Sequence, residues 1–347
     1  MKVLFCGLKY EYGKPESGLS FEYRNFFETL QAMPELEVEM FAVDERLLAV
    51  GREKMNEELK NSVVEKQPDL LFCFLYTDEI NKEIIEYITK KTKTKTFNWF
   101  ADDHWRFEIF SRLWAPLFTA VSTTDSEAVL KYRSIGVNII KTQWAANIHL
   151  YKPSLLPATS YPLPANNITF VGKNYGNRSK YINALKVFDL PAVGYGAGWE
   201  KGRVSFEDML KIFSNSKINL NFTQSAFANF TGKFKMLAKT ILHPYNAASY
   251  MKAYAGAQRN QIKGRTFEIP ACGGFMLTQD ADNLGEYYED GKEVVIFKNE
   301  DDMIEKCKYY LSHENERVGI AKAGYKRTLK EHTYELRFRE IFNKIFV

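Results

Sequence analysis

The chain has 347 residues, of which 45% are hydrophobic and 26% are charged, and it carries a formal net charge of +4 at pH 7. This length is enough for two domains with cores of their own, and this composition is that of an ordinary globular protein, which excludes fibrous and disordered classes. The mild positive charge suits an anionic ligand or a membrane surface, but it does not require nucleic acid as a partner.

The sequence carries few signals for export or for metal binding. No run approaches the roughly 18 apolar residues of a membrane-spanning helix, and the apolar run at the start is too short for a secretory signal. The four cysteines lack CxxC spacing: Cys6, Cys73, Cys272 and Cys307. We therefore expect a cytoplasmic protein with buried free thiols, at most peripheral to the inner face of a membrane.

The N-terminal half alternates short apolar runs with helical patterns. Strands are expected at residues 2–6, 38–43, 69–75, 96–100 and 118–122, with helices between them. This order predicts a parallel, doubly wound sheet whose ligands bind at the carboxyl ends of the strands. The loop after the first strand is not GxGxxG, so it has no dinucleotide-binding fingerprint. We assign residues 1–155 to this first Rossmann-like domain.

The strongest polar cluster of this half is Ala101-Asp-Asp-His-Trp-Arg106, directly after the strand at 96–100. Asp102, Asp103 and His104 would stand at the carboxyl end of a parallel strand, where buried polar groups commonly serve a site. The alternative is a solvated loop in which an aspartate caps the next helix, and the two roles can coexist. No other histidine or cysteine has a matching spacing, so we predict no metal site here.

Residues 156–167 are rich in proline, serine, threonine and asparagine, which predicts a hinge before a second domain. That domain opens with a strand ending at Gly172, and Lys173 and Arg178 bracket the loop before the next helix. A sharp loop with two cations before a helix N-terminus favours phosphate, whereas two solvated surface cations are the alternative. Thr223 directly follows a later strand.

Residues 226–260 form a basic, aromatic insertion without any aspartate or glutamate. Its lysines and arginine are Lys233, Lys235, Lys239, Lys252 and Arg259. Such a segment can pack as an extra helix pair, bind an anionic membrane or a lipid-linked acceptor, or hold another acceptor or partner. The sequence leaves these three interpretations open.

The stretch Gly264-Arg-Thr-Phe-Glu-Ile-Pro-Ala-Cys-Gly-Gly-Phe275 places Arg265 and Glu268 three residues apart, on one face if it is helical. Near a helix start, the cation suits a phosphate and the carboxylate can accept hydrogen bonds from ribose hydroxyls. The alternative is a surface ion pair. Because Pro270 removes a backbone donor, the helix is expected to start late or to kink.

The chain resembles a known family around this stretch. The residues from Lys263 to Phe275, followed by Asn283-Leu-Gly-Glu-Tyr-Tyr-Glu-Asp-Gly-Lys-Glu-Val294, are similar to the C-terminal half of CgeB-like (spore-maturation-type) glycosyltransferases, which are related to the group 1 retaining enzymes. The resemblance covers residues 165–342 well and the N-terminal half more loosely. Glu268 aligns with the second glutamate of the Glu-x7-Glu pattern of the wider group. Asn260 stands in place of the first, so no role of that first carboxylate carries over.

The resemblance implies the GT-B fold, with two Rossmann-like doubly wound domains facing a central cleft. The second domain, residues 168–330, would bind a nucleotide-sugar donor, the first would be the acceptor-side domain, and a last helix at 331–347 would cross back to the first. The implied reaction is transfer of a sugar to an acceptor hydroxyl, with retention, in glycan or glycoconjugate synthesis. The acceptor would be a glycan, a lipid-linked molecule or a protein, and neither a cofactor nor a metal would be needed.

The resemblance also implies roles for the candidate residues. Lys173, Arg178 and Arg265 would neutralise the leaving diphosphate, and Glu268 would hold the ribose. Donor-binding positions also include Gly172 and Thr223. Asp103, with Asp102 or His104, would orient or deprotonate the acceptor. Two alternatives remain: a nucleotide-sugar epimerase, and a non-catalytic nucleotide-sugar-binding protein.

Overall fold

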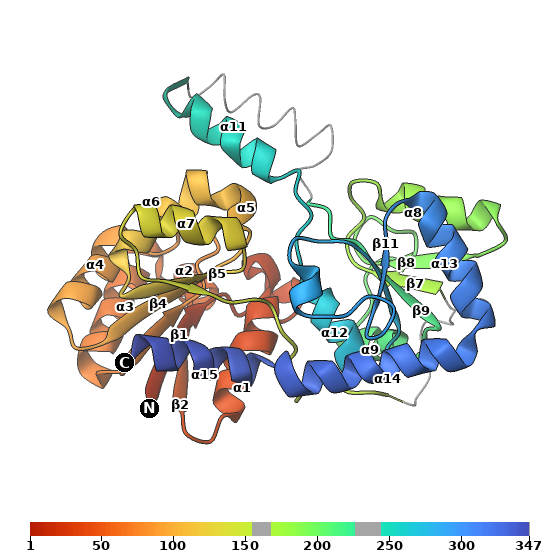
Figure 1. Cartoon of the computed structure of the whole chain (residues 1–347). Coiled ribbons are helices and arrows are strands. Elements are labelled where there is room, and N and C mark those ends of the chain that lie inside the picture. The colour runs from red at the N-terminus through yellow and green to blue at the C-terminus, as the bar shows by residue number, and fades with distance from the viewer. Residues whose placement is uncertain (155–167, 226–243, 347) are drawn as a thin grey trace. The chain divides into compact units, whose positions relative to one another are not determined.

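The computed structural model describes residues 1–154, 168–225 and 244–346, which fall into two compact units (Figure 1). Unit 1 comprises Met1–Gln143 and Tyr334–Val347, and unit 2 comprises Trp144–Thr333. The predicted hinge at 156–167 and residues 226–243 of the predicted insertion lie outside the described residues.

Unit 1 contains a six-stranded sheet in the order β2-β1-β3-β4-β5-β6, and every neighbouring pair is parallel. Its strands are β1 (Lys2–Gly7), β2 (Glu37–Ala42), β3 (Leu70–Cys73), β4 (Lys95–Phe100), β5 (Ala120–Thr123) and β6 (Ile139–Lys141). The chain adds β2 on one side of β1 and then β3 on the other side, so the order in which strands are added reverses at β1. Ligands of such sheets bind beside this point, at the carboxyl ends of the strands.

Helices cover both faces of this sheet. They are the π-helix η3 (Tyr23–Phe27), α1 (Glu28–Ala32), α2 (Val43–Val50), α3 (Arg52–Lys66), α4 (Lys82–Lys91), α5 (Asp103–Arg106), the π-helix η4 (Phe107–Ser111), α6 (Arg112–Trp114), α7 (Ser126–Ser134) and α15 (Tyr334–Ile345). Alternate residues of β1 face opposite sides, so Leu4 and Cys6 join the core formed with α3, α4 and α7.

The other face of the unit 1 sheet carries an aromatic core. Phe72 of β3 packs against Phe5, Phe97 and Phe338, with ring centroids 5.6, 4.9 and 5.6 Å away. Phe338 belongs to α15, whose buried residues face this core. The last helix of the chain therefore completes unit 1, because its apolar face covers the sheet on which the chain began.

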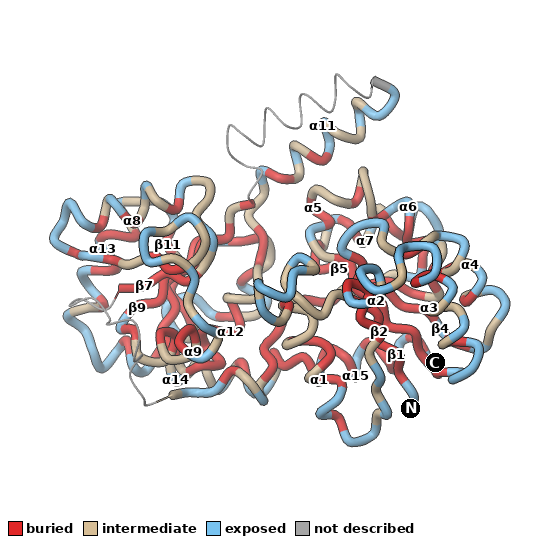
Figure 2. The backbone as a smooth tube through the Cα atoms, turned by 180° about the vertical axis from the view of Figure 1, so that it is seen from behind, coloured by how far each residue is buried: buried red, intermediate tan, exposed pale blue. Residues whose placement is uncertain are grey.

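Unit 2 contains a five-stranded parallel sheet in the order β11-β10-β9-β7-β8. Its strands are β7 (Ile168–Val171), β8 (Ala192–Tyr195), β9 (Ile218–Asn221), β10 (Met276–Gln279) and β11 (Val295–Phe297). Except for the edge strands β2 and β6 of unit 1, the strands of both sheets are buried along most of their length (Figure 2). Some of these strands, such as Leu70–Cys73, stand out in the sequence as continuous apolar runs, which is why they could be predicted. The prediction of two α/β units with parallel sheets is confirmed.

Within the described residues of unit 2, the α-helices are α8 (Arg178–Val187), α9 (Phe206–Asn215), α11 (Ala247–Gly256), α12 (Arg265–Ala271), α13 (Glu300–Ser312) and α14 (Glu314–Glu331). The side chain of Ser205 caps α9 by accepting a hydrogen bond from the backbone N–H of Asp208, 3.0 Å away. Contrary to expectation, α12 starts at Arg265 despite Pro270. The helix is only seven residues long, so the proline falls in its last turn.

Short 3-10 helices connect several of these elements. In unit 1 they are η1 (Glu11–Gly13), η2 (Pro15–Ser17) and η5 (Ala115–Leu117), and in unit 2 they are η7 (Pro244–Asn246) and η8 (Leu284–Glu286). Two of them, η1 and η2, form the loop after β1, at the point where the order of the unit 1 sheet reverses.

The four cysteines are free and buried, as predicted. No helix within the described ranges combines the length and the apolarity that crossing a bilayer requires.

Candidate functional site

In unit 2, β7 and β9 are neighbours, and the loops that leave their carboxyl ends flank the point where the strand order reverses. Gly172 follows β7, and its carbonyl accepts a hydrogen bond from the indole N–H of Trp199, 2.8 Å away. A Cβ atom on Gly196 would lie 2.4 Å from that carbonyl oxygen, and the φ of Gly196 is +125°. The loop after β8 can therefore approach Gly172 only because residue 196 has no side chain.

Arg178 fastens the loop after β7 to the end of β9. Its guanidinium donates to the carbonyl of Lys173 at 2.6 Å, to the hydroxyl of Tyr175 at 2.8 Å and to the carbonyl of Phe222 at 3.2 Å. The residue is only 5% exposed, and burial lowers the pKa of Arg178. Arg178 thus holds the loop from its buried side, whereas Lys173 is exposed.

The predicted pair at the start of α12 is an ion pair with a fully covered carboxylate. Arg265 donates to Glu268, which is 0% exposed, while the Arg265 side chain keeps 31% of its surface exposed. The other carboxylate oxygen accepts a 2.9 Å hydrogen bond from the hydroxyl of Tyr151. Burial alone lowers the pKa of Arg265, but the charge of Glu268 and the contact with Tyr151 outweigh it, so that the pKa is raised.

Thr223 is buried and ties the end of β9 to the loop after β10. Its hydroxyl donates to the carbonyl of Asp280 at 2.7 Å, and its backbone N–H donates to the side chain of Gln279 at 3.2 Å. Asn260 also donates to the Asp280 carbonyl, at 3.1 Å. Asn260 therefore supports the backbone of this loop.

Lys263 is a cation of this region that the sequence motifs did not single out. Its ammonium donates to the hydroxyl of Tyr175 at 2.9 Å and to the carbonyl of Gln224. Tyr175 also accepts from Arg178, so that Lys263 and Arg178 share one phenol oxygen. The available signal was the spacing Lys-Gly-Arg, which places Lys263 two residues before Arg265.

Asp103 lies at the carboxyl end of β4 in unit 1 and is 1% exposed. Its carboxylate accepts a 2.9 Å hydrogen bond from the hydroxyl of Tyr132. Burial raises the pKa of Asp103 to about 6, against the lowering effect of the hydroxyls of Ser111, Thr123 and Tyr132. Asp103 is therefore a carboxylate whose protonation changes near neutral pH.

The two neighbours of Asp103 differ in exposure. Asp102 is exposed and has a left-handed backbone, with φ +60°, and its side chain makes no helix-capping hydrogen bond. His104 is 5% exposed. Of the three predicted acceptor-side residues, Asp102 thus offers an exposed carboxylate, while Asp103 and His104 are held inside unit 1.

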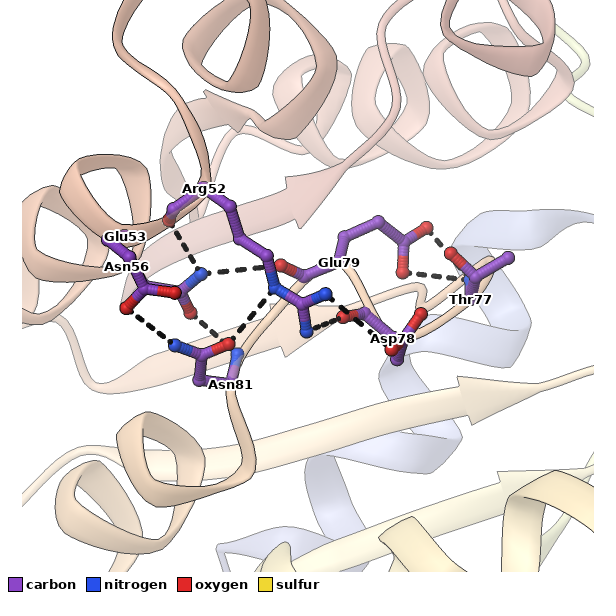
Figure 3. Close-up of polar contacts among 7 residues, drawn as sticks. All are labelled: Arg52, Glu53, Asn56, Thr77, Asp78, Glu79 and Asn81. Atoms are coloured by element: carbon purple, nitrogen blue, oxygen red, sulfur yellow. Dashed lines mark hydrogen bonds and ion pairs between the residues drawn. The ribbon is translucent and has the colours of Figure 1, made fainter.

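A polar network fixes the loop after β3 (Figure 3). The side chain of Asn56 donates to the carbonyl of Arg52 at 2.9 Å and accepts from the backbone N–H of Asn81 at 2.6 Å. The carboxylate of Glu79 accepts from the backbone N–H of Thr77, at 2.8 and 2.9 Å. These bonds hold the turn from both sides, which gives the residues at its tip a defined position.

Tyr76, at the tip of this turn, was not identified from the sequence as a site residue. It is 40% exposed and packs edge-on against Tyr12, which is 52% exposed, with ring centroids 6.1 Å apart. The carbonyl of Tyr76 accepts from Arg106 at 2.8 Å. The two tyrosines come from the loops after β1 and β3, the strands between which the order of the unit 1 sheet reverses.

Glu22 is a second titratable group of unit 1 that the sequence did not point to. Burial raises the pKa of Glu22 to about 7, and the charges of Glu11 and Glu79 raise it as well. It follows the same loop as Tyr12. No local pattern could have revealed it, because the shift arises from residues brought together by the fold.

Metal-ligating side chains do not converge in residues 1–154, 168–225 or 244–346, since no group of three or more histidine, cysteine, aspartate or glutamate side chains there could hold an ion.

Known proteins share both the sequence pattern and the fold. A family model described as "Glycosyl transferase-like" matches residues 178–343. Spore protein CgeB of Bacillus subtilis (strain 168) is 23% identical over 274 residues, which cover 78% of this chain and 80% of that protein.

Solved structures with the same fold span almost the whole chain. Sucrose-phosphate synthase from Thermosynechococcus elongatus has a TM-score of 0.63 at 10% identity and covers 100% of this chain and 99% of its own. A glycosyltransferase from Rickettsia africae ESF-5 has a TM-score of 0.62 at 11% identity, covering 99% and 98%. Anabaena Alr3699/HepE in complex with UDP has a TM-score of 0.56 at 13% identity, covering 99% of both chains. Together, these comparisons show that the chain has the GT-B fold, that its residues 178–343 match a glycosyl transferase-like family, and that it is similar to spore protein CgeB.

Proposed function

We propose that this protein is a glycosyltransferase that binds its nucleotide-sugar donor in unit 2 and transfers the sugar, with retention of anomeric configuration, to an acceptor hydroxyl in the synthesis of a glycan or glycoconjugate. One observation carries the assignment of the donor to unit 2. The ion pair of Arg265 with buried Glu268 and the buried Arg178 occur together where the strand order of the parallel sheet reverses.

The donor would be held through its diphosphate and its ribose. Cations around the loop after β7 and the start of α12 would stabilise the negative charge that develops on the leaving diphosphate. Glu268 would accept hydrogen bonds from the ribose hydroxyls. Since Glu268 is fully covered and already bonded to Arg265 and Tyr151, this role requires one of those partners to move aside. Gly172 and Thr223 would shape the donor site, because they hold the backbone of the loops that line it.

The acceptor would be handled by unit 1. Asp103, with a pKa of about 6, is mostly a carboxylate at pH 7 and has the basicity of a general base. Its burial favours a division of labour in which exposed Asp102 contacts the acceptor and Asp103 and His104 support it. The acceptor class includes glycans, lipid-linked molecules and proteins.

We also propose that the cations of unit 2 supply the charge that a divalent ion provides in other transferases, so that the reaction needs no metal. The insertion at 226–260 is proposed to contact the acceptor or an anionic membrane surface, with the enzyme otherwise in the cytoplasm. In its described part, Tyr245 is 99% exposed, and Met251 on α11 is 65% exposed beside exposed Lys252.

A two-step experiment tests the proposed function. A thermal-shift screen with UDP, GDP, dTDP, ADP and CMP identifies the nucleotide, with UDP as the first candidate because the HepE structure was solved with UDP. The protein is then incubated with the matching nucleotide sugars alone and with candidate acceptors. A transferase gives an acceptor-dependent product, an epimerase changes the sugar without an acceptor, and a binding protein gives only the thermal shift.

A further inference from the structure

We propose that Lys263, rather than the exposed Lys173, is the lysine that binds the leaving diphosphate, and that Tyr175 is the residue that positions it. This inference rests on the proposed nucleotide-sugar donor and deepens it, because it names the group that meets the phosphate oxygens.

The hydroxyl of Tyr175 lies between two cations. Arg178 donates to it at 2.8 Å and Lys263 at 2.9 Å, while the guanidinium of Arg178 stacks 3.7 Å from the centroid of the Tyr175 ring. A hydrogen bond from a cation to an anionic oxygen is stronger than one to a neutral oxygen. A phosphate oxygen would therefore compete well with the phenol for the ammonium of Lys263.

Lys263 can exchange the phenol oxygen of Tyr175 for a phosphate oxygen, whereas Arg178 cannot. Lys263 also donates to the carbonyl of Gln224, again an uncharged oxygen. Lysine carries three donors on a flexible stem, so a rotation of the side chain moves the charge without moving the backbone. Arg178 is held by the carbonyls of Lys173 and Phe222, and its release would free the loop after β7.

The net positive charge of the side chains around Tyr175 and the start of α12 favours a dianion as ligand. Arg178, Lys263 and Arg265 are three cationic side chains, and Glu268 is the carboxylate paired with one of them. Besides burial, the charge of Arg265 lowers the pKa of Arg178, so these two arginines repel each other. A bound diphosphate would relieve that repulsion. The side chain of Lys173 is exposed, and the loop uses its carbonyl as an acceptor for Arg178.

Isothermal titration calorimetry with inorganic pyrophosphate, and with the nucleoside diphosphate that binds best, separates the two lysines. Lys263→Met should weaken binding of both ligands about tenfold or more, as expected for loss of a charged hydrogen bond, and the matched variant Lys173→Met should change it less than about twofold. Tyr175→Phe keeps the ring beneath Arg178. Tyr175→Phe should lower the affinity for the diphosphate and leave the affinity for the corresponding nucleoside unchanged. A general loss of structure would lower both affinities.

The outcomes are distinct. Wild-type affinity in Lys263→Met, or a loss confined to Lys173→Met, overturns the inference and leaves the proposed function standing. A wild-type protein that binds neither pyrophosphate nor any nucleoside diphosphate contradicts the proposed function itself. If Lys263→Met fails to fold by its melting temperature, Tyr175→Phe decides: equal losses for nucleoside and diphosphate overturn the positioning role.

Discussion

The hydroxyl of Tyr151 donates a 2.9 Å hydrogen bond to the carboxylate of Glu268, although the two residues are 117 positions apart in the chain. This bond joins the segment after β6 to the start of α12 within unit 2. The carboxylate of Glu268 is fully buried, and this bond gives a partner to the oxygen that does not pair with Arg265. The segment from Trp144 thus belongs with unit 2, whereas the sequence placed the boundary at residue 155.

Glu268→Gln should weaken binding of the nucleoside diphosphate and also lower stability. Glutamine keeps the shape but not the charge, so Arg265 loses its carboxylate partner. Because the Arg265 side chain keeps partial contact with solvent, we expect a loss of about 1–3 kcal/mol in the free energy of unfolding. Loss of a charged hydrogen bond to ribose corresponds to about a tenfold to hundredfold weaker affinity.

Calorimetry and urea unfolding measure these two effects. The control is Glu289→Gln, which changes an exposed glutamate of the same unit and should alter neither quantity appreciably. Unchanged nucleotide affinity in Glu268→Gln would refute the ribose role.

Asp103→Asn should lower the rate of transfer, because Asp103 supports the acceptor-side Asp102, and it should leave nucleotide binding intact and stabilise the protein at high pH. The pKa of Asp103 is raised from 3.8 to about 6 by burial, so the folded state carries a penalty for ionising it. That penalty is absent below pH 3.8, grows as the pH rises to about 6 and is complete above it, at roughly 2–3 kcal/mol.

The measurement is the melting temperature of Asp103→Asn and wild type at about pH 4.5 and about pH 8, which lie on either side of the raised pKa. The gain of the variant over wild type should be larger at the higher pH. Asp102→Asn, at an exposed position, should show no such pH-dependent gain. A gain for Asp103→Asn that is larger at the lower pH would contradict the assigned shift.

Asn56→Ala should destabilise unit 1 by about 2–4 kcal/mol. The side chain is 1% exposed, and its loss leaves the backbone N–H of Asn81 and the carbonyls of Arg52 and Glu79 without their bonds (Figure 3). Chemical denaturation measures the change. Asn61→Ala, on the exposed side of the same helix, serves as the matched control and should differ little from wild type. Equal stability of the two variants would show that the network does not hold the loop.

Replacing Lys252 by Glu and Met251 by Ser on α11 should release the protein from anionic vesicles if the insertion contacts a membrane. Both side chains are exposed, and a basic residue near an anionic surface contributes about 1 kcal/mol. Sedimentation with anionic and neutral liposomes at low and high salt is the test. Wild-type protein that stays in the supernatant at low salt would remove the membrane proposal, and folding and nucleotide affinity should be unaffected.

The strands and the ion pair of α12 could be predicted because their signals are local. The strand at Ile168–Val171 is a continuous apolar run, and the spacing of Arg265 and Glu268 places them one helical turn apart. A helical segment is present between β1 and β2, as expected, but Tyr23–Phe27 is a π-helix, a change in hydrogen bonding that the apolar spacing does not encode.

The contacts that define the site are not local, so the sequence alone could not reveal them. Lys263 and Tyr175 are 88 positions apart, and the sequence does not show that Arg178 is held by three partners inside unit 2. Burial decides which cations face a ligand, and burial depends on the loops after β7 and β9 packing together.

The most direct measurement is release of nucleoside diphosphate from nucleotide sugars, followed by NMR with the wild-type protein and a panel of acceptors. At least one nucleotide sugar should be consumed in an acceptor-dependent way, the product should keep the anomeric configuration of the donor, and Glu268→Gln should lower the rate. A product with inverted configuration would contradict the retaining mechanism alone. If no nucleotide sugar is consumed and no nucleoside diphosphate binds in calorimetry, a donor site in unit 2 is contradicted.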